Sequence, residues 1–185
     1  AEVFALFQTV LTPLGLTPAT GDIGILLAAV RGLSTSEARK AALTRHIWRP
    51  ARFKALLDRF GGRAPVPPSR AALLQSLNAG ERPDPGAPMI GLRSVAEIDA
   101  RLAALREDAA TPPISAEEVA LLEGILDLDD ASPKALYFLR DTAANLPAIL
   151  PAVDRLSARL DALAARGVDV DTLEFEASHG RTTLE

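Results

Sequence analysis

Arg181 and Glu176, near the carboxyl end of the sequence, have side chains that suit ligand binding. An arginine offers a planar fork of five N–H donors, which holds a carboxylate or a phosphate. Arg181 lies beside Gly180, just beyond a predicted strand, and the Glu176 carboxylate can orient Arg181 or a ligand amine. The alternatives are a surface arginine paired with Glu174 or Glu176, and a solvated glutamate on a strand. We interpret Arg181 and Glu176 as ligand-binding residues.

The two histidines and the single tryptophan do not indicate catalysis or metal binding. His179 suits a pH-sensitive or ligand-contacting role, but a lone histidine is more often structural. His46 and Trp48 are predicted to be a helix-capping histidine and a half-buried indole, with a protein interface as the alternative. Two histidines and no cysteine disfavour a zinc site and exclude disulfides and thiol catalysis. We expect no catalytic residue, no metal and no cofactor.

A helix and a strand must position the two candidate residues. Apolar residues recur every three or four positions over 149–163, which predicts an amphipathic helix over 147–166 that Gly167 ends. Apolar and acidic residues then alternate, which predicts a strand over 172–178 with one apolar face. The charged face of this strand is expected to meet water or a ligand.

Capping signals and breakers divide the rest of the chain into helices. Three segments fit a capping box, in which a serine caps the helix and a glutamate reaches back: Ser34–Glu37, Ser94–Glu97 and Ser115–Glu118. Ser132-Pro133 is predicted as an N-cap with proline at N1. The nearly all-apolar first helix is expected to be buried on more than one side, and a short strand is predicted over 16–19. The predicted helices span 2–13, 22–31, 35–46, 50–60, 69–78, 94–109, 115–128, 132–143 and 147–166.

The predicted carboxyl-terminal strand and the residues after it resemble a known family. The run from Leu173 to Arg181, followed by Leu184-Glu185, resembles the histidine-A region of class II histidyl-tRNA synthetases. It is more similar to a paralogue of these synthetases, the ATP phosphoribosyltransferase regulatory subunit, whose members carry Phe-Asp-Ala-Ser-Phe-Gly-Arg-x-Leu-Asp/Glu. His179 stands where an apolar residue is usual, and one additional residue precedes Leu184. Gly21-Asp22, predicted as a turn glycine and a helix N-cap, stands where the family has Gly-Asp before a helix.

The resemblance implies a fold as well as a site. It implies a predominantly helical α+β chain, equivalent to the part of a class II synthetase-like catalytic domain that follows its second motif. Residues 1–33 would form one part of this core, and residues 145–185 would add the core helix and the strand with the histidine-A-like motif. Residues 34–144 would form a helical insertion. Arg181 and Glu176 would contact L-histidine.

The same resemblance implies regulation rather than catalysis. The family's regulatory subunits bind a short-form ATP phosphoribosyltransferase catalytic subunit in the first step of histidine biosynthesis. They contribute to activation and to allosteric histidine feedback without aminoacylation activity. The resemblance also implies that copies of this chain form a homo-oligomer within a hetero-oligomer. The alternatives are a fragment of an active histidyl-tRNA synthetase and a helical protein-interaction module.

Composition and charge restrict the classes of partner. The 185 residues contain no apolar run near 18 residues, and the start lacks a charged signal region, so we expect a cytoplasmic protein without a membrane partner. Residues 31–70 hold ten lysines or arginines against two acids, and residues 97–130 hold ten acids against two arginines. This pattern favours helices that face one another or carry solvated charge, with a protein partner as the alternative. A net charge of −4 and few aromatic residues make nucleic acid an unfavourable partner.

Overall fold

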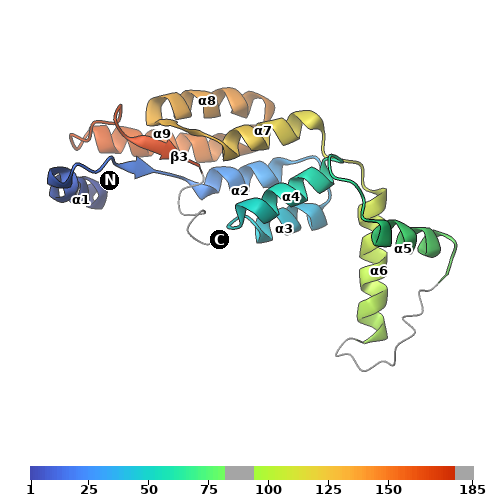
Figure 1. The fold of residues 1–185 in the computed structure, drawn as a ribbon. Coiled ribbons are helices and arrows are strands. Elements are labelled where there is room, and N and C mark those ends of the chain that lie inside the picture. Colours follow the sequence, from blue (N-terminus) through green and yellow to red (C-terminus); the bar gives the residue numbers. More distant parts are fainter. Residues whose placement is uncertain (82–93, 178–185) are drawn as a thin grey trace.

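The computed structural model describes residues 1–81 and 94–177, which are mostly helical with one small sheet (Figure 1). The predicted α+β, predominantly helical class is therefore confirmed. The predicted helices are also confirmed, to within about one turn at their ends. The α-helices are α1 (Glu2–Leu11), α2 (Ile23–Gly32), α3 (Glu37–Arg45), α4 (Pro50–Phe60), α5 (Pro68–Asn78), α6 (Val95–Ala110), α7 (Ala116–Leu126), α8 (Ser132–Asn145) and α9 (Leu150–Ala164), and two short 3₁₀ helices are η1 (Thr12–Leu14) and η2 (Pro147–Ile149).

The sheet joins segments that are far apart in the sequence. Its strands are β1 (Ala19–Thr20), β2 (Asp129–Ala131) and β3 (Glu174–Glu176), in the order β1-β3-β2. β1 pairs parallel to β3, and β2 pairs antiparallel to it. The strand predicted over 172–178 is confirmed as β3, whereas the strand predicted over 16–19 lies over 19–20. β2 was not predicted because its two aspartates give no apolar alternation.

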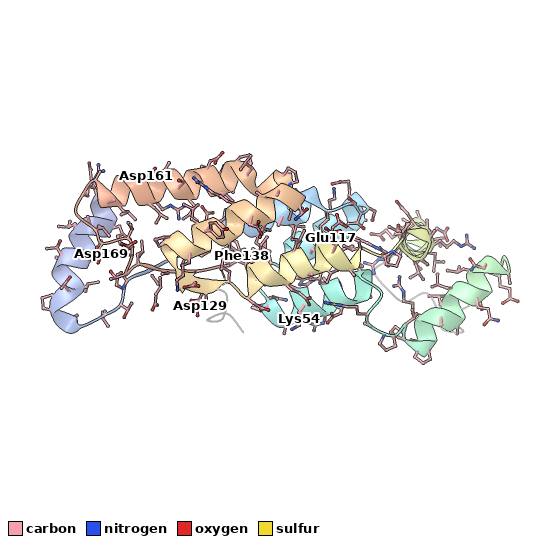
Figure 2. The ribbon with its side chains drawn as sticks, turned by 90° about the horizontal axis from the view of Figure 1, so that it is seen from above. Lys54, Glu117, Asp129, Phe138, Asp161 and Asp169 are labelled. Atoms are coloured by element: carbon pink, nitrogen blue, oxygen red, sulfur yellow. The ribbon has the colours of Figure 1, made fainter. Side chains whose placement is uncertain are left out.

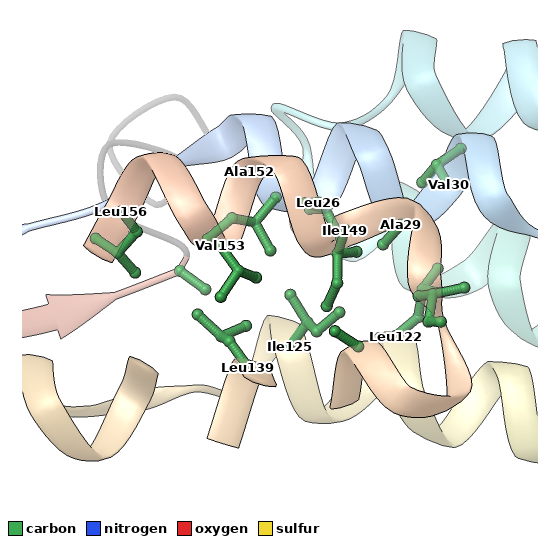
Figure 3. Packing of buried hydrophobic residues seen from close by; sticks show 14 of the residues in the cluster. Leu26, Ala29, Val30, Leu122, Ile125, Leu139, Ile149, Ala152, Val153 and Leu156 are labelled. Atoms are coloured by element: carbon green, nitrogen blue, oxygen red, sulfur yellow. The ribbon is translucent and has the colours of Figure 1, made fainter. Parts of the chain in front are cut away.

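The hydrophobic core lies between α2, α7, α8, α9 and η2. Figure 3 shows side chains from these elements gathered in one layer, and the most central ones are at most 1% exposed. In α2 the buried positions follow the spacing of a helix with one apolar face. The predicted apolar stripe of α9 is also buried. Among the side chains labelled in Figure 3 are Leu26, Ala29, Leu122, Ile125, Leu139, Ile149 and Val153.

Gly32 allows α2 and η2 to approach closely. A methyl group added at Gly32 would lie 2.5 Å from Cβ of Ala148 and 3.2 Å from a methyl carbon of Leu146. We expect Gly32→Ala to lower the free energy of unfolding by about 1–3 kcal/mol, because the core would be overpacked. Urea denaturation measures this loss. Gly124→Ala is the control, since its methyl would meet only the ring end of Phe138, which is 37% exposed and can move; equal effects of the two changes would contradict the packing argument.

The predicted helix caps are only partly correct. Ser94 and Glu97 form the expected capping box. Ser115 accepts a hydrogen bond from the Glu118 N–H as predicted, but Glu118 also accepts one from the Ser34 N–H at 2.7 Å. The prediction that Ser34 caps α3 is wrong, because the helix begins at Glu37 and the Ser36 side chain accepts from the Arg39 N–H. The N-cap predicted at Ser132 is also wrong, because this residue already belongs to α8 and its N–H donates to the Leu173 carbonyl of the strand segment.

The prediction that the first helix is buried on more than one side is wrong. α1 contains no buried residue, and among the described residues it packs mainly against η1 and α9. Glu2 holds it to the end of α9 through an ion pair with Arg166 at 2.9 Å. Apolar composition indicates that a helix can be covered, but it does not specify by what. The exposed apolar residues here are Val3, Leu6, Phe7, Val10 and Leu11.

α5 and α6 form an arm at one end of the molecule. Figure 1 shows α6 running across the long direction of the other helices, and Figure 2 views it along its axis. Asp108 of α6 attaches the arm through Arg39 of α3 at 2.7 Å and Arg59 of α4 at 3.2 Å, and within the arm it pairs with Arg70 of α5 at 2.6 Å. We call these four residues the Asp108 cluster. Together with the pair between Arg63 and Glu123 at 2.6 Å, it confirms that basic and acidic helices face one another.

Candidate binding site at the ends of the parallel strands

The parallel pairing of β1 with β3 brings the two predicted motif segments together. Parallel strands end at the same edge of a sheet. Thr20 pairs with Phe175, so Gly21-Asp22, which follow β1, lie near the end of β3. Glu176, at the end of β3, is half-buried there. This edge is the candidate site.

Glu176 occupies the strand position that its sequence pattern predicts. Phe175 is fully buried, and the flanking Glu174 and Glu176 lie on the opposite face, where they are exposed and half-buried, respectively. The backbone there is fixed on both sides, because Glu174 N–H donates to the Pro18 carbonyl and Ala177 N–H donates to the Leu128 carbonyl, both at 3.1 Å. Glu176 therefore belongs to a strand whose backbone is hydrogen-bonded on both sides.

Arg181 and His179 lie outside the described residues. The proposed contact between Arg181 and a ligand therefore stays a prediction.

Asp22 organises the β1 side of the site. It is the N-cap of α2, as predicted, and its carboxylate accepts a hydrogen bond from the Gly24 N–H at 2.9 Å. Arg159 of α9 donates to the same carboxylate at 2.6 Å and to the Gly21 carbonyl at 3.1 Å. Arg155, one turn earlier in α9, also reaches this region, since a methyl group at Gly24 would lie 3.6 Å from its Nη2.

This arrangement brings Asp22, Arg155 and Arg159 together, while Glu176 lies at the end of the strand that pairs with β1. Asp22 is neutralised by Arg159, while Arg155 is exposed. A ligand that carries both a carboxylate and an ammonium group matches such a mixed set of charges. The sequence analysis did not predict that arginines of α9 lie at this site. The only available signal was the spacing of Arg155 and Arg159, which places both on one side of a helix.

Replacing Asp22 should separate its two structural roles. We expect Asp22→Ala to lower the free energy of unfolding by about 1–2 kcal/mol, because it removes the cap of α2 and the partner of Arg159. Asp22→Asn should lose less, because asparagine caps a helix as well as aspartate does. Thermal and urea unfolding of both variants measure the difference. If Asn and Ala are equally destabilising, the cap contributes nothing.

Two hollows on the surface lie away from this edge. One, of about 400 Å³, is lined by α1 and the segment that enters β1, including Phe4, Phe7, Leu16 and Pro18, so it lies toward the amino end of β1. The other, of about 300 Å³, lies beside the Asp108 cluster. Neither contains Glu176 or Asp22. Hollow size alone therefore does not identify the candidate site.

The predicted roles of His46 and Trp48 agree with their positions. His46 is the C-cap residue of α3, and Trp48 is 46% exposed, so about half of its indole surface is covered. Over residues 1–81 and 94–177, no group of three or more histidines, cysteines or acids is placed to hold a metal ion. No helix in this described part has the length and apolarity needed to cross a membrane.

Comparisons with known proteins found no relative of this chain. No family model matches the chain, and neither a curated protein nor a solved structure shows significant similarity to it.

Proposed function

We propose that this chain is a regulatory subunit of ATP phosphoribosyltransferase, acting in the first step of histidine biosynthesis. It binds the short-form catalytic subunit in the cytoplasm, activates it and contributes to histidine feedback. The observation that carries the proposal is the parallel pairing of β1 with β3. It brings the Gly21-Asp22 segment and the Glu176 segment, which carry the family resemblance, to one edge of the sheet.

The fold proposed with this function is part of a class II synthetase-like catalytic domain. Its support is the packing between the two ends of the sequence, because 1–33 and 145–177 supply β1, α2, α9 and β3. α2 packs closely on η2, and Arg159 links α9 to the end of β1. Residues 34–144 remain the proposed helical insertion, although β2 from this segment also pairs with β3.

The proposal of binding without aminoacylation is supported by the sequence after β3. The run Ser178-His179-Gly180-Arg181 followed by two threonines departs from the Arg-Gly-Leu-Asp-Tyr-Tyr run of the synthetases. In our proposal Arg181 holds the carboxylate of L-histidine and Glu176 its ammonium group. Feedback then requires that histidine binds one state of the hetero-oligomer more tightly than another.

Reconstitution tests the proposal. The ATP phosphoribosyltransferase activity of a short-form catalytic subunit is measured alone, with this protein, and with this protein plus L-histidine. We expect activation by the protein and inhibition by histidine only in its presence. ATP–pyrophosphate exchange by this protein would instead indicate a histidyl-tRNA synthetase. If the protein has no effect in any combination, a helical protein-interaction module is the remaining alternative.

A further inference from the structure

The turn between α3 and α4 carries positive charge that no ion pair among residues 1–81 and 94–177 neutralises. From Ala38 to Leu57 the sequence has no acidic residue. Two of the basic residues in this stretch are engaged internally, since Arg39 binds Asp108 and Lys40 pairs with Glu37 at 3.0 Å. Within the described part of the chain, no ion pair engages the exposed side chains at the turn itself. These are Arg45, Arg49 and Arg52, and together with Trp48 we call them the basic turn.

The basic turn presents its tryptophan on a fixed backbone. Ile47 is 2% exposed and Phe53 is fully buried, so the turn is anchored in the core on both sides of Trp48. His46 N–H donates to the Leu43 carbonyl at 3.0 Å, and Arg49 N–H donates to the His46 carbonyl at 2.9 Å. An indole held in this way loses little backbone entropy when it is covered by a partner.

The positive surface continues from the turn along α3. Arg31, Lys40, Thr44 and Arg45 surround a shallow hollow of about 410 Å³, with Glu37 as the one acid at its border. Arg45 therefore belongs both to this hollow and to the basic turn.

We propose that the basic turn docks onto an acidic surface of a protein partner. Tryptophan and arginine are the residues most enriched among those that dominate binding energy, and arginine forks match carboxylates. Because no ion pair in the described part of the chain engages these arginines, the turn favours a negatively charged partner. A nucleic acid fits less well, because the turn offers one indole for stacking and the chain carries a net charge of −4. That the partner is the short-form catalytic subunit rests on the proposed function.

The test measures the affinity and association rate of the 185-residue chain for the short-form catalytic subunit by surface-based kinetics. The variants are Trp48→Ala and the double change Arg45→Glu with Arg49→Glu. Matched controls are Tyr137→Ala and Lys134→Glu on α8, where Tyr137 is 77% exposed and the Lys134 side chain is 74% exposed. We expect each basic-turn variant to weaken binding by about tenfold or more, and the double change to reduce the salt dependence of association. The controls should bind like the wild type.

Three other outcomes would overturn the inference. Wild-type affinity in the basic-turn variants would overturn the docking surface and leave the proposed function intact. No binding by the wild type would overturn the proposed function and, with it, this partner. Binding of a single-stranded RNA oligonucleotide that is lost in the same variants, while binding of the catalytic subunit is unchanged, would assign the surface to nucleic acid instead. Circular dichroism of each variant verifies that the helices are retained.

Discussion

Replacing Phe175 with alanine should lower the free energy of unfolding by about 3–5 kcal/mol, the range for removing a buried aromatic ring from a core. Phe175 is 0% exposed and lies in the central strand, between β1 and β2. Its backbone pairs with Thr20 on one side and Asp130 on the other. Loss of the ring therefore weakens the core where the two ends of the sequence meet.

Urea denaturation monitored by circular dichroism measures this change. Phe7→Ala is the matched control, because it removes the same ring from a position that is 59% exposed. Its effect should stay within about 0.5 kcal/mol, as expected for a surface substitution. Similar losses at the two positions would show that β3 is not the structural centre of the molecule.

Removing the charge of Asp108 should have the second largest effect. Its carboxylate receives hydrogen bonds from three arginines, and its side chain is only 19% exposed. Arg39 also donates to the carbonyls of Asp108, Thr111 and Pro112. We expect Asp108→Asn to cost about 2–3 kcal/mol, somewhat less than breaking a fully buried ion pair, because three guanidinium groups would lose their common anion.

The control for Asp108→Asn is Glu107→Gln, which removes a charge from the exposed neighbouring position in α6. Chemical denaturation at neutral pH should show a large loss for the first change and almost none for the second. Limited proteolysis should also cut the α5–α6 arm of Asp108→Asn faster, since the cluster attaches this arm. Equal stability of the two variants would contradict the structural role of the cluster.

The Asp108 contribution should also depend on pH. Burial of the carboxyl acts to raise its pKa, but the hydrogen bonds and charge of Arg39, with the charges of Arg59 and Arg70, outweigh burial and leave the pKa of Asp108 below its usual value. A carboxyl with a lowered folded-state pKa stabilises the fold above its unfolded pKa, about 3.9, and this contribution disappears as pH falls through the folded-state pKa. The difference between wild type and Asp108→Asn should thus be constant near neutral pH and shrink below about pH 4. A difference that grows on acidification would contradict this sign.

Local patterns predicted most of the fold because they report local physics. The apolar stripe of α9, the alternation around Phe175 and the capping box at Ser94 each depend on neighbours within a few residues. Gly167 was expected to end α9, and it has the left-handed φ of 78° just beyond the helix. Element type and approximate bounds could therefore be read from the sequence.

What the sequence did not predict depends on contacts between distant residues. Ser34 and Ser36 both suit an N-cap; Ser36 serves, since its hydroxyl accepts from the Arg39 N–H, while the Ser34 N–H donates to Glu118, 84 residues away. Arg159 and Asp22 are 137 residues apart, so nothing local indicates their pairing. The apolar residues of α1 gave a false expectation of burial. Of the residues at the candidate site, Glu176 was predicted from the sequence as a ligand-binding residue and Asp22 only as a helix N-cap, while the arginines of α9 required the fold.

Calorimetric titration of L-histidine tests the proposed regulatory site most directly. It is performed on the complex of this chain with the short-form catalytic subunit, for wild type, Arg181→Ala and the control Arg140→Ala on α8. The account predicts that histidine binds the wild type and the control equally, and that Arg181→Ala weakens binding by about tenfold or more, as expected for loss of a charge-assisted hydrogen-bond pair. Equal histidine affinity in all three proteins, or no binding to any of them, would contradict it.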